Sequence, residues 1–522
     1  MISHATLTNY SASELAAMIA TGDVSAAEVV EAHIERIEAV NPRINAVVSK
    51  RYAAARAEAQ AADAVRKSGN ELGPLHGVPI TIKDCLDVQG MPTTFGLPNR
   101  REHRAVADDP YVRRLRQAGA IILGKTNTPQ LLLYYESHNL LYGRTNNPWN
   151  EARSSGGSSG GEAAIIASYG SPLGLGNDIG GSLRAPAHFC GIAGLKPTTP
   201  RILDFTRMAD PPTYGPITAA AGPLARDVAD LALALELMND VPHPLASLPQ
   251  PLPDFKDVDL TKLRIGYYLD DSTLTPSPAI KRAVREAAEV LRSRGAEVQP
   301  WTPPRVSEAV DLYYRIMSSD SGNLLRSLLA EDAATPQLAA ILFLAKQSRW
   351  KLRIMQRVLE RAGQRSLATS IGAFGYPADK HLSMMQAELA AYRQHFARAL
   401  DQASDGPIDV ILCPPCALPA YTHGASQQLG VGGGYAVLYN VLGYPAGSVP
   451  FTRVRPNEEI GRIASLDIVQ REARTVEVAS AGLPVGVQVV ARPWQDHIAL
   501  AVMQCLQDAA RGGTDYPRLP IE

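Results

Sequence analysis

The sequence predicts an α/β fold, with one large domain over residues 1–522 in which helices cover both faces of a central, mixed and twisted β-sheet. Segments with the period-2 alternation typical of strands recur between segments with helical periodicity, which is the pattern of a sheet covered by helices. At 522 residues and 45% hydrophobic, the chain is also long enough to bury a large core. No internal repeat interrupts the pattern.

Helical signals dominate residues 8–65, which we expect to form an N-terminal helical segment. Ser11 and Ser25 are each followed three residues later by a glutamate, the spacing of a capping box at the start of a helix. The pair Asn41 and Pro42 predicts the end of the second of these helices, since proline disrupts helix interiors.

Strands and helices then alternate to the end of the chain. The first two strands are predicted over 76–84 and 120–126, so Lys83 lies near a strand end. The Pro-rich stretch 241–255 is predicted to be a surface loop rather than a domain linker. The remaining predictions are helices over 229–238 and 277–295, and strands over 263–269, 296–301, 409–415, 446–454 and 482–491.

Charge and cysteine content exclude several classes of function. The 51 Lys and Arg balance 52 Asp and Glu, so the basic footprint of a nucleic-acid-binding protein is missing. Five cysteines are too few for a disulfide framework, and the N-terminus does not resemble a signal peptide, which predicts a cytoplasmic protein. Cys413 and Cys416 have CxxC spacing without a second pair, and we interpret them as core thiols. We expect neither a metal nor a cofactor.

One segment leaves two interpretations open. Residues 336–362 combine an apolar run, Trp350 and several Arg and Lys at helical spacing. This pattern suits a helix packed on the core or a helix at a membrane interface. No run of 18 apolar residues occurs in the chain, so we predict no transmembrane helix.

A serine- and glycine-rich run between Ser154 and Pro197 is the most informative part of the chain. Its glycines let backbone amides approach a ligand closely. Ser159 and Glu162 have capping-box spacing for the helix that follows. Ser158 lies in a GxSxG pattern, but a nucleophile elbow should directly follow a buried strand, which the preceding residues do not predict.

Three motifs together carry a resemblance to a known family. In the order GVPITIKD, GGSSGGEAA and GNDIGGSLRAPAHFCGIAGLKPT, they resemble the amidase signature family of serine hydrolases. The resemblance continues to GLPVGVQVVARPWQD, and NNPWN and LYNVLGYPAGSVP are most similar to the fatty acid amide hydrolase branch. It therefore covers most of the chain.

The resemblance implies a catalytic triad and an oxyanion hole. Ser182 would be the nucleophile, Ser158 the proton-shuttling serine, joined to Gly157 by a cis peptide bond, and Lys83 the base. The implied oxyanion donors are the backbone amides of Ile179, Gly180, Gly181 and Ser182.

The residues around Ser182 bear on the same site. Asp178 and Arg184 flank the nucleophile and are expected to brace its loop, as Ser159 would brace the helix start. Asn177 is a departure, because the family commonly has Thr or Ser there. It puts the hydrogen bonding around the loop in question.

Amide hydrolysis needs a base that later protonates the amine leaving group. A lysine can do both only when neutral, so its pKa must fall from about 10.4 to roughly 7–8, which burial can achieve. The position of Lys83 at the end of an apolar strand favours burial. Lys196 is the alternative base, but it lies beyond the nucleophile on a predicted turn.

The resemblance also implies a substrate class. Leu132, Leu133 and Tyr134 would line an acyl channel, and 320–380 would form a helical cap over it. We expect an amidase that acts on fatty acyl or aryl amides through an acyl-enzyme, with esters, anilides and carbamates as further substrates. The alternative is an amidotransferase A-type subunit that supplies ammonia for aminoacyl-tRNA amidation. Peripheral membrane contact and homodimerisation are the expected associations.

Overall fold

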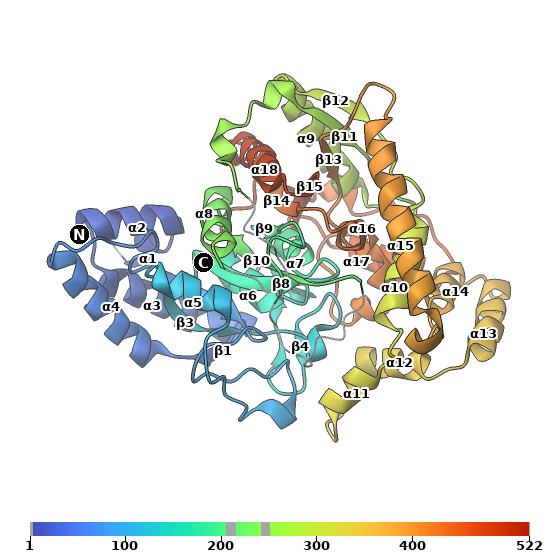
Figure 1. The fold of residues 1–522 in the computed structure, drawn as a ribbon, viewed down its shortest axis with the longest axis horizontal. Helices are drawn as coiled ribbons and strands as arrows, with labels where there is room; N and C mark the ends of the chain where they lie inside the picture. The colour runs from blue at the N-terminus through green and yellow to red at the C-terminus, as the bar shows by residue number, and fades with distance from the viewer. Residues whose placement is uncertain (1–3, 205–215, 242–250, 521–522) are drawn as a thin grey trace.

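A mixed sheet of eleven strands runs through the centre of the molecule (Figure 1). The computed structural model describes residues 4–204, 216–241 and 251–520. In spatial order the strands are β1 (Val47–Lys50), β3 (Ile121–Thr126), β2 (Pro79–Lys83), β8 (Leu173–Asp178), β10 (Ala220–Ala225), β9 (Ala193–Lys196), β14 (Ala446–Arg453), β15 (Pro484–Ala491), β13 (Val410–Cys413), β11 (Arg264–Tyr267) and β12 (Glu297–Pro300). The predicted α/β fold with a mixed sheet is therefore confirmed.

Three parallel strands decide where polar side chains meet. β2 pairs in parallel with β3 on one side and with β8 on the other. The carboxyl ends of parallel strands meet at the same edge of a sheet, so Lys83 at the end of β2 lies beside Asn177 and Asp178 at the end of β8. Lys83 is 94 positions before Asn177 in the sequence.

Helices flank the sheet. Those that pack directly on its strands include α6, α7, α8, α9 and α18. The helices are α1 (His4–Leu7), α2 (Ala12–Thr21), α3 (Ala26–Ile44), α4 (Tyr52–Lys67), α5 (Pro110–Gln117), α6 (Gly160–Ala167), α7 (Arg184–Cys190), α8 (Val228–Asn239), α9 (Pro278–Ser293), α10 (Val306–Met317), α11 (Asn323–Leu329), α12 (Pro336–Ala345), α13 (Arg349–Arg361), α14 (Arg365–Gly372), α15 (Ala378–Asp401), α16 (Gly434–Leu442), α17 (Ile468–Glu477) and α18 (Asp496–Arg511).

Short strands connect β3 to α6. They form two small antiparallel pairs, β4 (His138–Asn139) with β5 (Gly143–Arg144), and β6 (Asn146–Asn147) with β7 (Asn150–Ser154). The sequence had not indicated them, since two-residue strands leave no periodic pattern.

The N-terminal segment shows one correct and one wrong prediction. Both capping boxes form, with Ser11 and Ser25 each accepting from the amide three residues on. The prediction that Asn41 and Pro42 end the helix is wrong, because α3 continues to Ile44 with Pro42 inside its last turn. A proline this close to the C-terminal end of α3 removes one backbone hydrogen bond, and the helix continues past it. The helix ends at Asn45, which has a left-handed backbone conformation (φ 49°). The strand β1 also interrupts the 8–65 helical segment.

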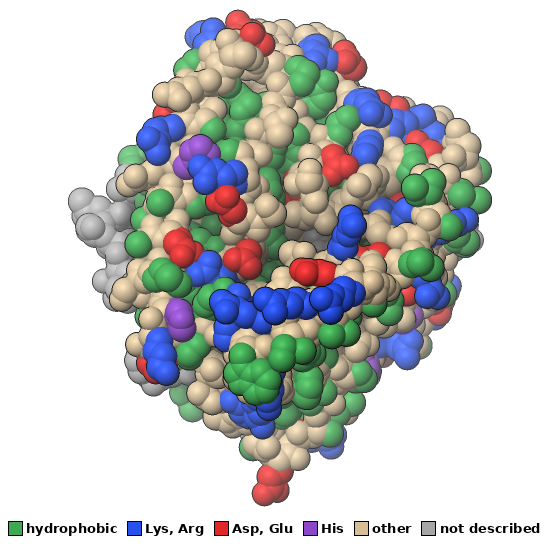
Figure 2. All heavy atoms as spheres, turned by 90° about the vertical axis from the view of Figure 1, so that its right-hand side faces the viewer, with side chains coloured by type: hydrophobic (Ala, Val, Ile, Leu, Met, Phe, Trp, Pro, Cys, Tyr) green, Lys and Arg blue, Asp and Glu red, His purple; other side chains and the backbone are tan. Residues whose placement is uncertain are grey.

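The region 320–380 forms a separate group of short helices, α11 to α14. The prediction of one helix over 336–362 is wrong, because α12 and α13 are distinct and Ser348 at the start of α13 is extended. Buried Leu352 packs with Ile371 and Phe374 in a small cluster of its own. Figure 2 faces this side of the molecule and shows hydrophobic side chains gathered next to Lys and Arg.

Two further predictions concern the chain as a whole. Most of the Pro-rich stretch 241–255 lies outside the described residues, so its loop prediction stays a prediction. No helix within the described ranges is long and apolar enough to cross a membrane.

Candidate active site

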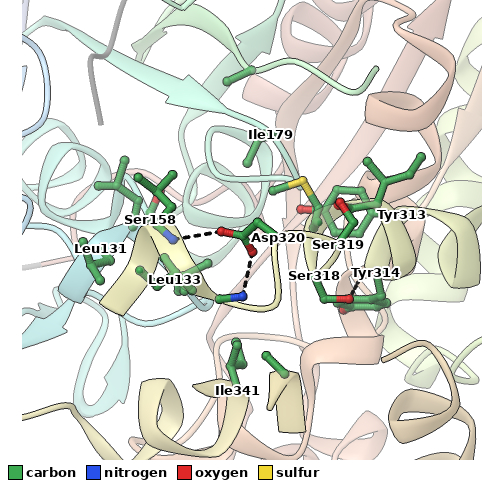
Figure 3. Close-up of a pocket in the computed structure, with 18 of the residues that line it drawn as sticks. Leu131, Leu133, Ser158, Ile179, Tyr313, Tyr314, Ser318, Ser319, Asp320 and Ile341 are labelled. Atoms are coloured by element: carbon green, nitrogen blue, oxygen red, sulfur yellow. Dashed lines mark hydrogen bonds between the residues drawn. The ribbon is translucent and has the colours of Figure 1, made fainter. Parts of the chain in front are cut away.

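A cavity opens at the sheet edge where β2 and β8 end, and both predicted catalytic serines line it (Figure 3). Most of its wall is apolar. It is lined by Leu131, Leu132, Leu133, Ile179, Ala219, Tyr313, Tyr314, Ile316, Met317, Leu324, Leu325, Ile341, Ala345 and Phe374, with Ser158, Asn177, Ser182, Asp204, Ser318, Ser319, Asp320 and Gly322 as the polar and glycine part. Helices α10 and α12 supply the side opposite the serines.

Lys83 is fully buried beneath this cavity. Its Nζ lies 2.6 Å from Ser158 Oγ and 2.6 Å from Asn177 Oδ1. The structure thus brings together a lysine from β2, a serine from the loop before α6 and an amide from the end of β8. Ser158 therefore has a lysine, not a histidine, as its hydrogen-bond partner.

Burial lowers the pKa of Lys83 from the ordinary range of a lysine. Four groups oppose this shift by favouring the charged amine, namely Cys85, Asp204, Asp178 and Glu162. Burial is the largest effect, so the pKa of Lys83 moves in the direction that general-base chemistry requires.

Ser158 is fixed by a tightly packed backbone. The peptide bond between Gly157 and Ser158 is cis, and the Ser158 carbonyl accepts a hydrogen bond from Thr128 Oγ1 at 3.0 Å. A Cβ atom on Gly157 would lie 2.4 Å from the carbonyl oxygen of Tyr134. Only glycine fits there, because the neighbouring backbone of Tyr134 to Glu136 leaves no room for a side chain.

The predicted capping box at Ser159 is absent. Ser159 is the residue before α6, but its side chain makes no capping hydrogen bond. Glu162 turns into the core instead, where it accepts hydrogen bonds from Thr81 and Thr126, and burial raises its pKa to about 7. The Ser159 amide donates to the Ser182 carbonyl at 3.2 Å, which ties the two halves of the serine-glycine run together.

The loop before Ser182 is built around the Asp178 carboxylate. Arg184 donates to it from Nε at 3.0 Å and from Nη2 at 2.9 Å. Asn440 donates at 2.9 Å. Burial would raise the pKa of Asp178, but Arg184, Asn440 and the Gly181 amide together outweigh burial and hold the pKa below its usual range.

This bracing engages one of the predicted oxyanion donors. The Gly181 amide donates to Asp178 Oδ1 at 2.7 Å. The amides of Ile179, Gly180 and Ser182 donate to no acceptor within the described part of the chain.

Lys196 is held away from this centre. It is buried on β9, and its Nζ donates to the Pro197 carbonyl at 2.9 Å and to Thr199 Oγ1 at 3.3 Å. Burial lowers the pKa of Lys196 to about 7. Its pKa alone would therefore make it a candidate base, and only its position distinguishes it from Lys83.

The residues predicted to line the acyl channel do not all face the cavity. Leu132 and Leu133 line the cavity, whereas Tyr134 turns away and donates from its hydroxyl to the Gln337 carbonyl of α12 at 2.7 Å. The sequence reasoning missed Tyr313, Met317 and Asp204. No motif marks them, since Tyr313 and Met317 are on α10 and Asp204 is in the loop after β9, and the tertiary fold brings both to the cavity.

The cysteines and potential metal ligands show no site among the described residues. All five cysteines are free, and Cys413 and Cys416 are both buried. In the described ranges no group of three or more His, Cys, Asp or Glu could hold a metal ion.

Comparisons with known proteins match nearly the whole chain. A family model described as Amidase matches residues 28–500. Fatty acid amide hydrolase 1 of Caenorhabditis elegans is 32% identical over 503 residues, which cover 94% of this chain and 86% of that protein. A glutamyl-tRNA(Gln) amidotransferase subunit of Salinispora arenicola is 32% identical over 527 residues, covering 96% and 98%. A solved fatty acid amide hydrolase superposes with a TM-score of 0.82 at 26% identity, covering 98% of this chain and 87% of that one.

Proposed function

This chain belongs to the amidase signature family of hydrolases, and we propose that it cleaves the C–N bond of hydrophobic fatty acyl or aryl amides. The observation that carries the proposal is the 2.6 Å contact between Lys83 Nζ and Ser158 Oγ beneath a cavity that Ser182 also lines. A buried lysine paired with a serine has few structural uses, whereas it is what activation of a serine nucleophile requires.

The acylation step follows from these positions. Neutral Lys83 takes the proton of Ser158, which takes the proton of Ser182 as Ser182 Oγ bonds to the substrate carbonyl carbon. The carbonyl π electrons move to oxygen, and the amides of Ile179, Gly180 and Ser182 donate to that oxyanion. The same relay run backwards protonates the nitrogen as the C–N bond breaks, leaving an acyl-Ser182 and a free amine.

Water completes the cycle by the same relay. Lys83, neutral again, draws a proton from water through Ser158 as the water oxygen bonds to the acyl carbon. Collapse of the second tetrahedral intermediate breaks the ester bond, and the proton returns to Ser182. Esters, anilides and carbamates fit the same steps, since each offers a carbonyl carbon with a leaving group.

The cavity supports hydrophobic acyl or aryl groups. Leucine, isoleucine, methionine and phenylalanine side chains from six separate segments line it. Burying apolar substrate surface there contributes about 25 cal/mol per Å². We propose this apolar wall as the determinant of substrate class.

The amidotransferase A-type function is the second candidate. It is supported by the 32% identity over 96% of this chain to a protein of that type. The apolar cavity favours the first candidate, because a tRNA-linked glutamyl group is polar and charged. Release of an amine from an N-acyl or N-aryl amide by the isolated chain, without tRNA, would favour the hydrolase.

Replacement of the nucleophile tests the proposal directly. Ser182→Ala is expected to abolish amide hydrolysis and covalent labelling by a fluorophosphonate probe, since both need the same oxygen. A panel of acyl amides, anilides and carbamates of increasing chain length then measures specificity. Undiminished labelling of the variant would exclude Ser182 as the nucleophile.

We further propose that α12 and α13 touch a lipid surface. Phe343, Trp350, Ile354 and Val358 are 51–62% exposed, and Lys351 and Arg353 lie on the same helix as three of them. Exposed apolar side chains next to cations are typical of peripheral contact with anionic lipids. Homodimerisation through this face is the competing outcome, which the oligomeric state in solution would reveal.

A further inference from the structure

A chain of two short hydrogen bonds extends from Lys83 away from the serines. Lys83 Nζ lies 2.6 Å from Asn177 Oδ1, and Asn177 Nδ2 donates to Asp204 Oδ2 at 2.6 Å. Asn177 and Asp204 both line the cavity, and Lys83 is fully buried below it. A carboxylate is thereby linked to the amine through one side-chain amide.

The carboxylate fixes which way the amide faces. A carboxylate oxygen accepts hydrogen bonds and cannot donate them, so the NH₂ group of Asn177 must point to Asp204. The Asn177 oxygen is then the atom that faces Lys83. With another partner in place of Asp204, either end of the amide could face the amine.

This orientation decides what Lys83 can do. A neutral amine has two N–H bonds and one lone pair. Since the Asn177 oxygen only accepts, it takes one N–H and leaves the lone pair for the hydroxyl of Ser158, 2.6 Å away. A hydroxyl at position 177 could instead donate to the lone pair and compete with Ser158.

We propose that Asn177 and Asp204 form a positioning pair that aims the lone pair of Lys83 at Ser158 and sets the pH at which Lys83 becomes an active base. The inference rests on the proposed function of Lys83. Neither residue touches the substrate or exchanges a proton in this scheme; both act through the lysine.

Several other ionisable groups surround the pair. Cys85, Asp178 and Glu162 also influence Lys83, whereas Asp109 and Tyr111 lie close enough to be influenced by Asp204. Of the groups acting on Lys83, Asp178 is neutralised by Arg184 and Glu162 is held by Thr81 and Thr126. Asp204 is thus the carboxylate coupled to the amine by a hydrogen-bonded side chain.

The pH profile of kcat/KM for amide hydrolysis tests the pair. Asp204→Asn removes the negative charge that favours the protonated amine, so Lys83 loses its proton at lower pH. The acid limb is expected to move down by about one pH unit. One unit below the wild-type midpoint, activity relative to each enzyme's own plateau should rise about fivefold.

A second variant and a double-mutant cycle separate positioning from a general loss of structure. Asn177→Thr removes the hydrogen-bonded link between Lys83 and Asp204 and should also move the acid limb of the pH profile to lower pH. In the Asn177→Thr background, Asp204→Asn should shift the limb by less than half its effect in the wild type. Asp320→Asn, which removes another carboxylate lining the cavity, should leave the limb in place.

The outcomes are distinguishable from failure of the proposed function. Fluorophosphonate labelling of Ser182 in the same wild-type samples reports on the nucleophile, whatever the variants do. An acid limb that stays in place in both single variants would overturn the pair. So would an undiminished shift in the double variant.

Discussion

The sheet edge that holds Lys83 and the helical region 320–380 are built in opposite ways. At the sheet edge, charged and polar groups are buried and each is held by fixed partners, as Arg184 and Asn440 hold Asp178. In the helical region, large apolar side chains such as Trp350 are exposed, and hydrophobic side chains are visible on this side of the molecule (Figure 2). The first region holds a few polar groups in fixed positions, and the second exposes apolar side chains at the protein surface. We expect chemistry to depend on the first and substrate access on the second.

Removal of Lys83 should have the largest effect and tests whether the buried edge carries the chemistry. Lys83→Ala is expected to lower kcat/KM for an amide by about 10³-fold or more. The matched ester should lose less, because an alkoxide leaves with less need for a proton than an amine. Equal losses for the matched amide and ester would show that Lys83 acts only as a structural cation.

The pH dependence of the free energy of unfolding tests the buried sheet edge at Glu162. Because burial raises its native-state pKa to about 7, above the unfolded value of about 4.3, the fold favours the protonated carboxyl. That contribution is complete below about pH 4.3 and is lost as the pH rises through about 7, a change of about 4 kcal/mol.

Glu162→Gln keeps the shape of the neutral acid and should remove this loss. The difference in free energy of unfolding between variant and wild type should therefore grow in favour of the variant from pH 4 to 7, measured by denaturant titration. A difference that does not change with pH would mean that the pKa of Glu162 is the same in the native and unfolded states.

Leu133 tests the cavity wall between the two regions. Leu133→Ala should lower kcat/KM about tenfold for long-chain acyl amides and little for acetyl amides, because it removes apolar contact with the chain alone. The control is Leu140→Ala, whose side chain is 47% exposed. A uniform loss across chain lengths would speak against a channel at this position.

Substitution of an exposed residue on α13 should have the smallest effect on catalysis. Trp350→Ser is expected to leave hydrolysis of a short water-soluble amide unchanged and to weaken sedimentation with phosphatidylserine-containing vesicles several-fold. Lys67→Ser, at the end of α4, removes a charged side chain from a distant helix as the control. Unchanged vesicle binding by the Trp350 variant would exclude the lipid contact.

Prediction from sequence succeeded where a pattern is local. The strands at 79–83 and 121–126 and the capping boxes at Ser11 and Ser25 depend on neighbours within a few residues. Prediction failed where contacts with residues distant in the sequence determine the local structure. Glu162 has capping-box spacing after Ser159 but bonds to Thr81 and Thr126. The fully buried strand β8, in which leucine alternates only with glycine, was not among the predicted strands.

The sequence by itself determined the α/β class, the family and the residues from which a site could be made. It favoured Lys83 over Lys196 but predicted a turn for Lys196, which is buried at the end of β9 and has a lowered pKa, as Lys83 does. Nor did it find Asp204 or show that Asp178 occupies the Gly181 amide. The parallel pairing of β2 with β8 places Lys83 beside Asn177, because hydrogen bonds act over about 3 Å, whatever the separation along the chain.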